Sequence, residues 1–377
     1  MTGGRTRVLV LAGSPKGNTS VTMAYVEWLR KSFPSGIWKV EQISSRSRLL
    51  ENNMAAFDSV IAAVGEADLI LWAVPLYVFT VPSQYKRFIE LVYERDARYA
   101  FAGKYAAILT TSVHFYDHLS QQYLREVSED LGMMVAGSIS PGMFDLNKTG
   151  GVKALGDFGR AVSGVVDRKL VMPRFSVPLP DPLPRMVNRD HTGEEEPRRH
   201  VPGQLYASRP VFRSAGRIAI LVDEPDGPVG AMAGRFADAV RVLAVPADSG
   251  SAGISIDVVG LPSIHIAGGC MGCLRCGVTD HCVYEGKDGF IDMYRQRLMT
   301  ADVIVFAVTL RDRGVSSTFK RFLDRGFFNT HRRSFRGAQM VFLVSGALSL
   351  AGTVYEMIHA YAEWQGANLV DIVSDEP

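Results

Sequence analysis

Cysteine is scarce in this sequence, and all of it lies in one place. Only four of the 377 residues are cysteine, and they are confined to Cys270, Cys273, Cys276 and Cys282. A disulfide framework uses pairs of cysteines spread through a secreted chain, so we expect none here. The thiols should instead stay reduced and available to a metal, as in a cytoplasmic protein.

The sequence also lacks the signals for membranes, export and nucleic acid. Its best candidate for a membrane span, residues 69–81, is too short to cross a bilayer. A strand pattern begins at Arg7 in place of a signal peptide. A formal net charge of +2 gives the chain no strong attraction for nucleic acid or anionic lipid. We therefore predict cytoplasmic localisation, no membrane insertion and no nucleic-acid partner.

Apolar stretches of strand length alternate with helical patterns along the chain, which predicts an α/β fold with parallel sheets. Five strands with intervening helices in each half fit two tandem flavodoxin-like, doubly wound, five-stranded parallel sheets of order 2-1-3-4-5. The predicted strands are residues 6–12, 38–43, 68–74, 105–111 and 134–139, then 217–222, 253–258, 302–308, 339–345 and 368–373. The predicted helices of the first half are residues 19–32, 54–65, 82–94, 119–131 and 152–170.

The two halves resemble each other in residues as well as in pattern. The segment 67–74 aligns with 301–308, and without a gap Lys86-Arg-Phe88 then aligns with Lys320-Arg-Phe322. Such ungapped identity indicates an internal duplication. We predict domains at 1–171 and 215–377, joined by an extended proline-rich linker over 172–214.

A phosphate-binding loop is predicted once, after the first strand. The stretch from Gly13 to Ser20 is rich in glycine and hydroxyl side chains and opens a helix, whose N-terminus favours an anion. The candidate ligands are Ser14, Lys16, Asn18, Thr19 and Ser20. The equivalent turn of the second half, 223–230, carries three carboxylates, which would repel a phosphate.

The cysteines follow the pattern C-x2-C-x2-C-x5-C over thirteen residues. Four thiolates from one loop are the usual protein ligands of a [4Fe–4S] cluster, so Cys270, Cys273, Cys276 and Cys282 are predicted to bind one. Two alternatives remain open. The loop could hold structural zinc, with His281 as a further ligand, or it could be a relic without metal.

The stretch Gly13-Ser-Pro-Lys-Gly-Asn-Thr19, then Pro75-Leu-Tyr77, then Lys86-Arg-Phe88, resembles the NAD(P)H-dependent FMN reductase family of flavodoxin-like proteins. The cysteine run resembles that of the iron–sulfur flavoproteins in the same superfamily. The resemblance implies that Ser14, Lys16, Asn18 and Thr19 bind the FMN phosphate. It also implies that Pro75, Leu76, Tyr77 and Val78 run along the isoalloxazine ring. His114 and Tyr116, in the loop after the fourth strand, are further candidates for contact with the flavin.

In proteins of that kind one domain carries both sites, and dimerisation brings flavin and cluster together. This chain divides them, because the first half has the loop and the second has the cysteines. We therefore expect an internal pseudo-dimer in which FMN of the first half faces a cluster of the second.

The predicted function is a flavin- and iron–sulfur-dependent oxidoreductase, and no catalytic acid or base is predicted. The alternatives are an NAD(P)H-dependent FMN or quinone reductase with a vestigial or zinc-binding cysteine loop, and a non-enzymatic redox-responsive binding module. NAD(P)H as donor rests on the resemblance alone. The expected partners are a small redox donor or acceptor or a ferredoxin-like protein, which a basic patch at residues 331–333 could receive. The chain could also form a homodimer.

Overall fold

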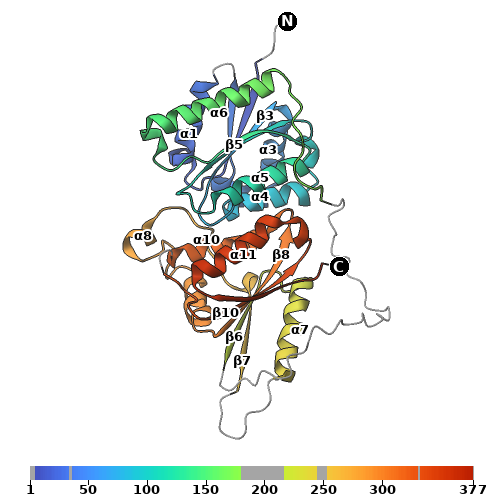
Figure 1. Ribbon diagram of the computed structural model, residues 1–377, viewed down its shortest axis with the longest axis vertical. Helices are drawn as coiled ribbons and strands as arrows, with labels where there is room; N and C mark the ends of the chain where they lie inside the picture. Colours follow the sequence, from blue (N-terminus) through green and yellow to red (C-terminus); the bar gives the residue numbers. More distant parts are fainter. Residues whose placement is uncertain (1–4, 34–35, 180–215, 244–252, 330–331, 377) are drawn as a thin grey trace, which may run out of the picture.

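A computed structural model describes the chain except for residues 1–4, 34–35, 180–215, 244–252, 330–331 and 377. Each half is built around a parallel sheet, and the two halves stack along the long axis of the molecule (Figure 1). Among the described residues, no helix is both long and apolar enough to cross a membrane. Most of the predicted linker lies outside the described residues, so the domain boundaries stay predictions.

The elements of the first half are β1 (Arg7–Ala12), α1 (Val21–Ser32), β2 (Ile37–Gln42), α2 (Ser47–Asn52), α3 (Met54–Glu66), β3 (Leu69–Pro75), α4 (Ser83–Glu94), β4 (Tyr105–Thr111), α5 (Asp117–Asp130), β5 (Met134–Ile139) and α6 (Thr149–Asp167). Those of the second are β6 (Arg217–Val222), α7 (Pro228–Leu243), β7 (Ser255–Gly260), α8 (Arg275–Thr279), α9 (Phe290–Met293), β8 (Val303–Arg311), β9 (Gly314–Val315), α10 (Ser317–Gly326), β10 (Gln339–Ser345), α11 (Gly352–Gln365) and β11 (Asn368–Ser374).

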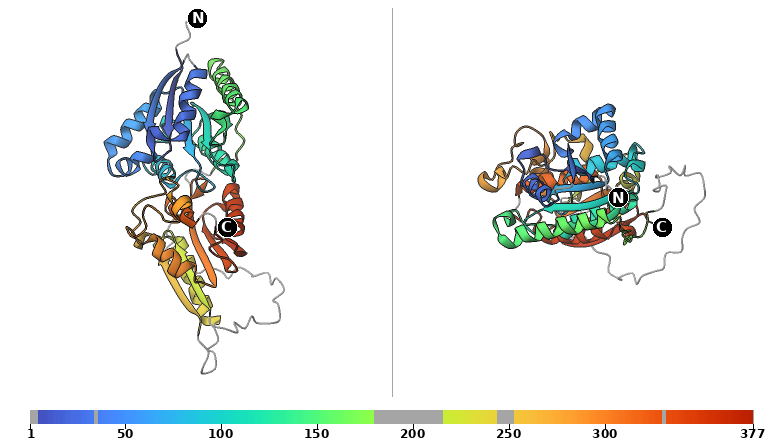
Figure 2. Two further views of the ribbon diagram at one scale, coloured as in Figure 1. Left: turned by 90° about the vertical axis from the view of Figure 1, so that its left-hand side faces the viewer. Right: turned by 90° about the horizontal axis from the view of Figure 1, so that it is seen from above.

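The first sheet has the order β2-β1-β3-β4-β5, as predicted. The strands β3 and β4 lie inside it and are almost entirely apolar, because helices cover both of their faces. Helix starts are set locally: the Ser20 side chain accepts from the backbone N–H of Met23 at α1, and Asn53 does the same for Ala56 at α3. Figure 2 shows α6 along an outer face of this half.

The second sheet repeats the order, as β7-β6-β8-β10-β11, so the predicted duplication is confirmed at the level of topology. The hairpin at the end of β8 was not predicted. After β8 the chain turns back through Asp312 at φ 54°, and β9 pairs antiparallel with the end of β8. This hairpin is too short to give a period-2 pattern in the sequence.

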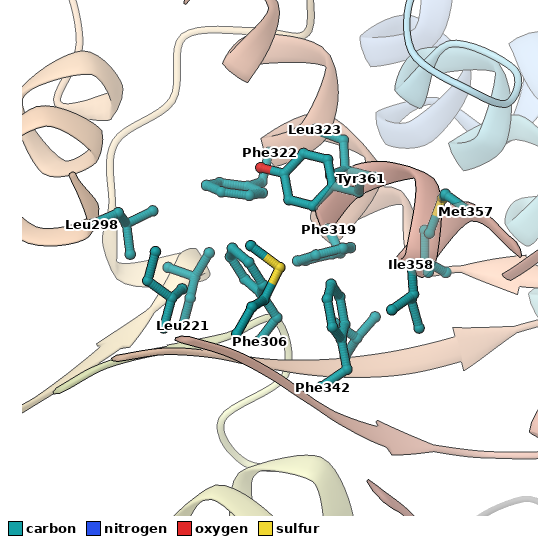
Figure 3. Close-up of a cluster of buried hydrophobic side chains, with 14 of the residues drawn as sticks. Leu221, Leu298, Phe306, Phe319, Phe322, Leu323, Phe342, Met357, Ile358 and Tyr361 are labelled. Carbon is teal, nitrogen blue, oxygen red and sulfur yellow. The ribbon is translucent and has the colours of Figure 1, made fainter. Parts of the chain in front are cut away.

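The core of the second half is rich in aromatic rings. Phe306 of β8 lies 5.6 Å from Phe319 and 5.5 Å from Phe322 between ring centroids, and Tyr361 of α11 packs against the same group (Figure 3). This cluster also takes in Val78, Phe79 and Leu119 from the first half. The two halves therefore share one hydrophobic core where they meet.

The contact between the halves is pseudo-symmetric and centres on α4 and α10. The backbone N–H of Ser83 donates to Asp324 Oδ2 at 2.7 Å. The backbone N–H of Ser317 donates to Glu90 Oε1 at 2.6 Å. Each number in the second half is 234 higher than its counterpart, which is the offset of the aligned sequences. All four residues are buried or nearly so, and the arrangement is that of an isologous dimer interface within one chain.

Candidate functional site

The loop after β1 has the tight geometry that an anion site requires. The N–H of Gly13 donates to the carbonyl of Ala73 at 2.7 Å, and a Cβ on Gly13 would lie 2.5 Å from Val74 Cγ1. Only glycine fits so close an approach. Gly17 has φ +58°, a region that glycine enters without strain. Ser14 is buried beneath the turn, whereas Lys16, Asn18 and Thr19 are exposed along it.

Polar atoms without partners gather beside this loop. Gln42 Nε2 donates to Asn18 Oδ1 at 2.6 Å, but Gln42 Oε1 is buried with no hydrogen-bond partner among the described residues. Ser44 Oγ, just beyond β2, is likewise buried and unsatisfied. Buried polar groups are rarely left unpaired unless a ligand or water meets them. The carboxyl edge of the first sheet is therefore suited to the polar part of FMN.

The segment after β3 reaches from this loop toward the second half. The N–H of Leu76 donates to the carbonyl of Thr111 at 2.9 Å, which fixes the segment to β4. The Tyr77 hydroxyl lies near the Ser14 hydroxyl. Burial, reinforced by the nearby Cys270 and Asp324, raises the pKa of Tyr77 far above its usual value, against the lowering influence of that hydroxyl. Tyr77 is thus a neutral hydrogen-bonding group held against the phosphate loop.

The loop after β4 packs mainly through aromatic rings, unlike the loops after β1 and β3. His114 and Tyr116 both have positive φ, and His114 Nδ1 lies 3.0 Å from Asp117 Oδ2. Tyr116 packs edge-on against Phe79, with ring centroids 5.7 Å apart. Its neighbour Phe115 lies 5.9 Å from Trp364 of α11. The aromatic rings of this loop pack at the boundary between the halves, and their predicted contact with flavin stays a prediction.

The cysteine loop meets the first half at Tyr77. A Cβ on Gly272 would lie 2.4 Å from the Tyr77 hydroxyl oxygen, so the two segments of the chain are in direct contact there. Gln84 Nε2 of α4 donates to the carbonyl of Cys270 at 3.2 Å. Sequence reasoning missed Gln84, because no local signal marks a contact between residues 186 positions apart. One side chain, Tyr77, therefore touches both predicted sites.

The four cysteines line one small cavity, together with Tyr284 and Arg325. The N–H of Gly272 lies 3.4 Å from Cys270 Sγ, and burial raises the pKa of the Cys270 thiol to about 12. Cys273 is exposed and the others are part-buried. His281 points away to Glu285, with Nδ1 to Oε2 at 2.8 Å. Across the described part of the chain, no three His, Cys, Asp or Glu side chains are placed to hold a metal ion.

The cavity does not decide between the metal predictions. All four cysteines line it, as a [4Fe–4S] cluster would require, but the described side chains form no group placed to hold a metal ion. The cluster and the zinc alternative therefore both stay predictions. The left-handed conformations of Leu274 and Asp280 show that the loop is held in an uncommon shape on both sides of Cys276.

In the equivalent turn of the second half, acidic side chains occupy the position where an anion would bind. Asp223 takes the place of Gly13 and is buried, and it accepts hydrogen bonds from the N–H and hydroxyl of Thr309 and from the Ser316 hydroxyl. Glu224, at the position of Ser14, is bound by Arg311. A carboxylate thus occupies the end of the strand where a phosphate would bind in the first half.

The buried carboxyl of Asp223 should make stability depend on pH. Burial raises its pKa to about 7. Below about pH 4 both folded and unfolded states hold the proton, so the group contributes nothing. Between about pH 4 and 7 the unfolded chain releases the proton first, and the free energy of unfolding falls. Asp223→Asn cannot ionise, so its stability relative to wild type should rise by about 2–4 kcal/mol over that range.

Denaturant titrations at pH 4 and 7.5 would measure this change. Asp226→Asn is the matched control, because Asp226 lies in the same turn but is exposed. A difference between Asp223→Asn and wild type that stays constant with pH would contradict the prediction.

The family model described as NADPH-dependent FMN reductase matches residues 6–143 and again residues 233–374. The second match begins within α7, after the acidic turn at 223–230. The part of the second half left unmatched therefore includes the counterpart of the phosphate loop. No curated protein matches the chain.

Several solved structures resemble one half of the chain. An NADH:FMN oxidoreductase, EMOB, in its apo form is 20% identical, with a TM-score of 0.36 over 45% of this chain and 91% of that one. The flavoenzyme NAD(P)H:(acceptor) oxidoreductase FerB from Paracoccus denitrificans is 17% identical, with a TM-score of 0.35 over 43% and 98%. An FMN-dependent NADH-azoreductase from Bacillus anthracis, solved with FMN, is 12% identical, with a TM-score of 0.30 over 43% and 99%.

Proposed function

Because the chain belongs to the NADPH-dependent FMN reductase family, we propose that it is an FMN-dependent oxidoreductase with one flavin, in its first half, and an electron-accepting group at the cysteine loop of its second. The observation that carries this proposal is the position of Tyr77. Its hydroxyl lies near Ser14 of the phosphate loop, and its ring lies against Gly272 of the cysteine loop.

FMN would be held by the loop at the carboxyl end of β1. Ser14, Lys16, Asn18, Thr19 and Ser20 would bind its phosphate, and Pro75, Leu76, Tyr77 and Val78 would line its ring, with His114 and Tyr116 beyond them. FMN when bound supplies hydride and electron transfer. The chain would orient it: Gly13 and Gly17 shape the turn, and the buried Tyr77 packs between the two loops.

The cysteine loop would hold a [4Fe–4S] cluster through Cys270, Cys273, Cys276 and Cys282. Such a cluster supplies one-electron chemistry. The N–H of Gly272 already points at Cys270 Sγ and would stabilise negative charge on sulfur. The raised pKa of the Cys270 thiol means that ligation must displace a proton, so binding of iron should strengthen as the pH rises.

Quantitation after anaerobic purification tests this proposal. We expect about one FMN, four irons and four acid-labile sulfides per chain. Cys273→Ser should lower iron and sulfide severalfold and leave FMN in place, because Cys273 belongs to the second half and is exposed. Met271→Leu, in the same loop, is the matched control and should keep both.

FMN without iron or sulfide would contradict the cluster and favour a two-electron FMN or quinone reductase with a vestigial cysteine loop. Bound flavin without turnover of any donor would favour a non-enzymatic redox module. NAD(P)H as donor, a small molecule or ferredoxin-like protein as partner, homodimerisation and a cytoplasmic location all remain part of the proposal. Of the basic patch, His331 lies outside the described residues, and Arg332 is paired with Asp280 at 3.4 Å.

A further inference from the structure

A cleft between the two halves has no part in the function proposed above. It has a volume of about 370 Å³ and is lined by α2, α4, α10 and the backbone of Gly268 and Gly269. The helices α4 and α10 lie side by side between the two sheets (Figure 1). The phosphate-loop residues 13–20 are not among its lining residues. Its walls are mostly charged, so its chemistry depends on which charges are already paired.

The carboxylates of the cleft are all satisfied. Arg87 donates to Glu51, Glu90 and Glu94, at 2.8, 3.2 and 2.7 Å between the atoms joined. Glu224 accepts two hydrogen bonds from the guanidinium of Arg311. No carboxylate of the lining is therefore left to neutralise a further cation.

Arg321 is a cation of the cleft without a carboxylate partner among the described residues. Within the described residues it makes no hydrogen bond or ion pair, and its Nε atom is buried without a partner. Burial lowers the pKa of Arg321, and the charges of Arg325 and Arg48 add to this effect against the opposing influence of Glu51. Arg325 is paired with Asp288, whereas Arg48 donates only to the carbonyl of Ala267. Two guanidinium groups of the cleft thus lack an anionic partner.

The duplication supplies an internal comparison. Arg321 lies 234 positions after Arg87, so the two arginines are equivalent. Arg87 is bound by Glu94, but the position equivalent to Glu94 is Phe328. Arg321 has therefore kept its charge although the counterpart of Glu94 is lost, and Asp324, the counterpart of Glu90, is paired with Lys320 instead. An unpaired, part-buried guanidinium is unfavourable, so its retention is best explained by a ligand that supplies the missing charge.

We propose that this cleft binds a small dianion with oxygen ligands, such as a phosphate or dicarboxylate group of a soluble molecule, through Arg321 and Arg48. Guanidinium groups bind such oxygens with paired, charge-assisted hydrogen bonds. The bound anion would lie next to Gly269 and so beside the cysteine loop, which it could influence through the Arg48 contact with Ala267.

Calorimetric titration with inorganic phosphate and with malonate, at constant ionic strength, tests the site in the FMN-saturated full chain. Arg321→Met should weaken binding roughly 10- to 100-fold, the loss expected for charge-assisted hydrogen bonds. Arg241→Met is the control, because Arg241 is an exposed arginine of α7 outside the cleft, and it should bind as wild type does. No binding of either anion to the wild type up to about 10 mM would overturn the proposal.

A second readout separates a ligand-binding arginine from a structural one. Without anion, Arg321→Met should unfold at a higher denaturant concentration than wild type, because an unpaired charge has been removed. With saturating phosphate the order should reverse, because only the wild type gains stability from binding. A structural arginine would instead lower stability in both conditions, which would overturn the proposal. Arg48→Met, at an exposed position, should also weaken binding and serves if Arg321→Met does not fold.

Anion binding in the cleft can be tested separately from FMN binding. Ser14 does not line the cleft, so a Ser14→Glu protein should still bind phosphate there even if it binds no FMN. Comparing NADPH with NADH, which differ by one phosphate, shows whether the anion belongs to the electron donor or to a different molecule.

Discussion

Replacing Lys86 with methionine should lower the free energy of unfolding by about 3–5 kcal/mol. Lys86 is 2% exposed, and its Nζ lies 3.0 Å from Glu90 Oε1, 2.8 Å from Asp312 Oδ2 and 3.1 Å from the carbonyl of Arg311. Methionine preserves the length of the side chain but leaves Asp312 buried without its cation, and it removes one of the two cations that pair with Glu90. Removing one partner of a buried ion pair is strongly destabilising for this reason.

Chemical denaturation at pH 8 would measure the loss. Lys153→Met is the matched control, since Lys153 pairs with Asp157 at the same i,i+4 spacing and at 2.8 Å but is 76% exposed. That exposed pair should contribute no more than about 0.5 kcal/mol. The loss at Lys86 should shrink near pH 5, because burial raises the pKa of Asp312 to about 6 and a protonated carboxyl needs no cation. Equal losses for the two lysines would refute the interpretation.

The variant Ser14→Glu should raise the dissociation constant for FMN at least about 100-fold. It places in the first loop the residue that the second loop carries at Glu224. Ser14 is 2% exposed, so the added carboxylate would face the phosphate in a poorly hydrated turn, where like charges repel strongly. Titration of the apoprotein by flavin fluorescence measures the change, and a 100-fold increase corresponds to about 2.7 kcal/mol.

Glu224→Ser is the matched control and should leave FMN affinity unchanged, because the second turn is occupied by its own side chains. Lys16→Glu adds a charge at an exposed position of the same loop and guards against misfolding at the buried one. Tight FMN binding by both Ser14→Glu and Lys16→Glu would show that the phosphate lies elsewhere.

Much of the fold was predictable because it depends on local patterns. The alternation of apolar strands and helices predicted a doubly wound fold, whose strand order the structure confirms. The ungapped match around Lys86 and Lys320 indicated the duplication. Trp72, in the apolar strand β3, is fully buried and stacks on Phe101 with ring centroids 5.9 Å apart. The burial of such residues can be predicted, because apolar residues in a strand pattern indicate a strand inside the sheet.

The rest depends on contacts between the halves, which leave no periodic signal. The contact of Tyr77 with Gly272 and the bond from Gln84 to the Cys270 carbonyl join segments nearly 200 positions apart. The difference between Arg87 and Arg321 was equally hidden, because both look like surface arginines on an amphipathic helix. Only their partners, read in three dimensions, separate one from the other.

The pseudo-symmetric contact of α4 with α10 has a consequence for how this chain can change. In a dimer of identical subunits every substitution appears on both sides of the interface at once. Here the two sides are encoded separately, so Asp223 could replace a glycine in one half while Gly13 stayed in the other. Because one polypeptide carries both sides, their effective concentration is fixed and pairing does not depend on protein abundance. Because the two halves are covalently joined, one half can lose a binding site that the other half retains.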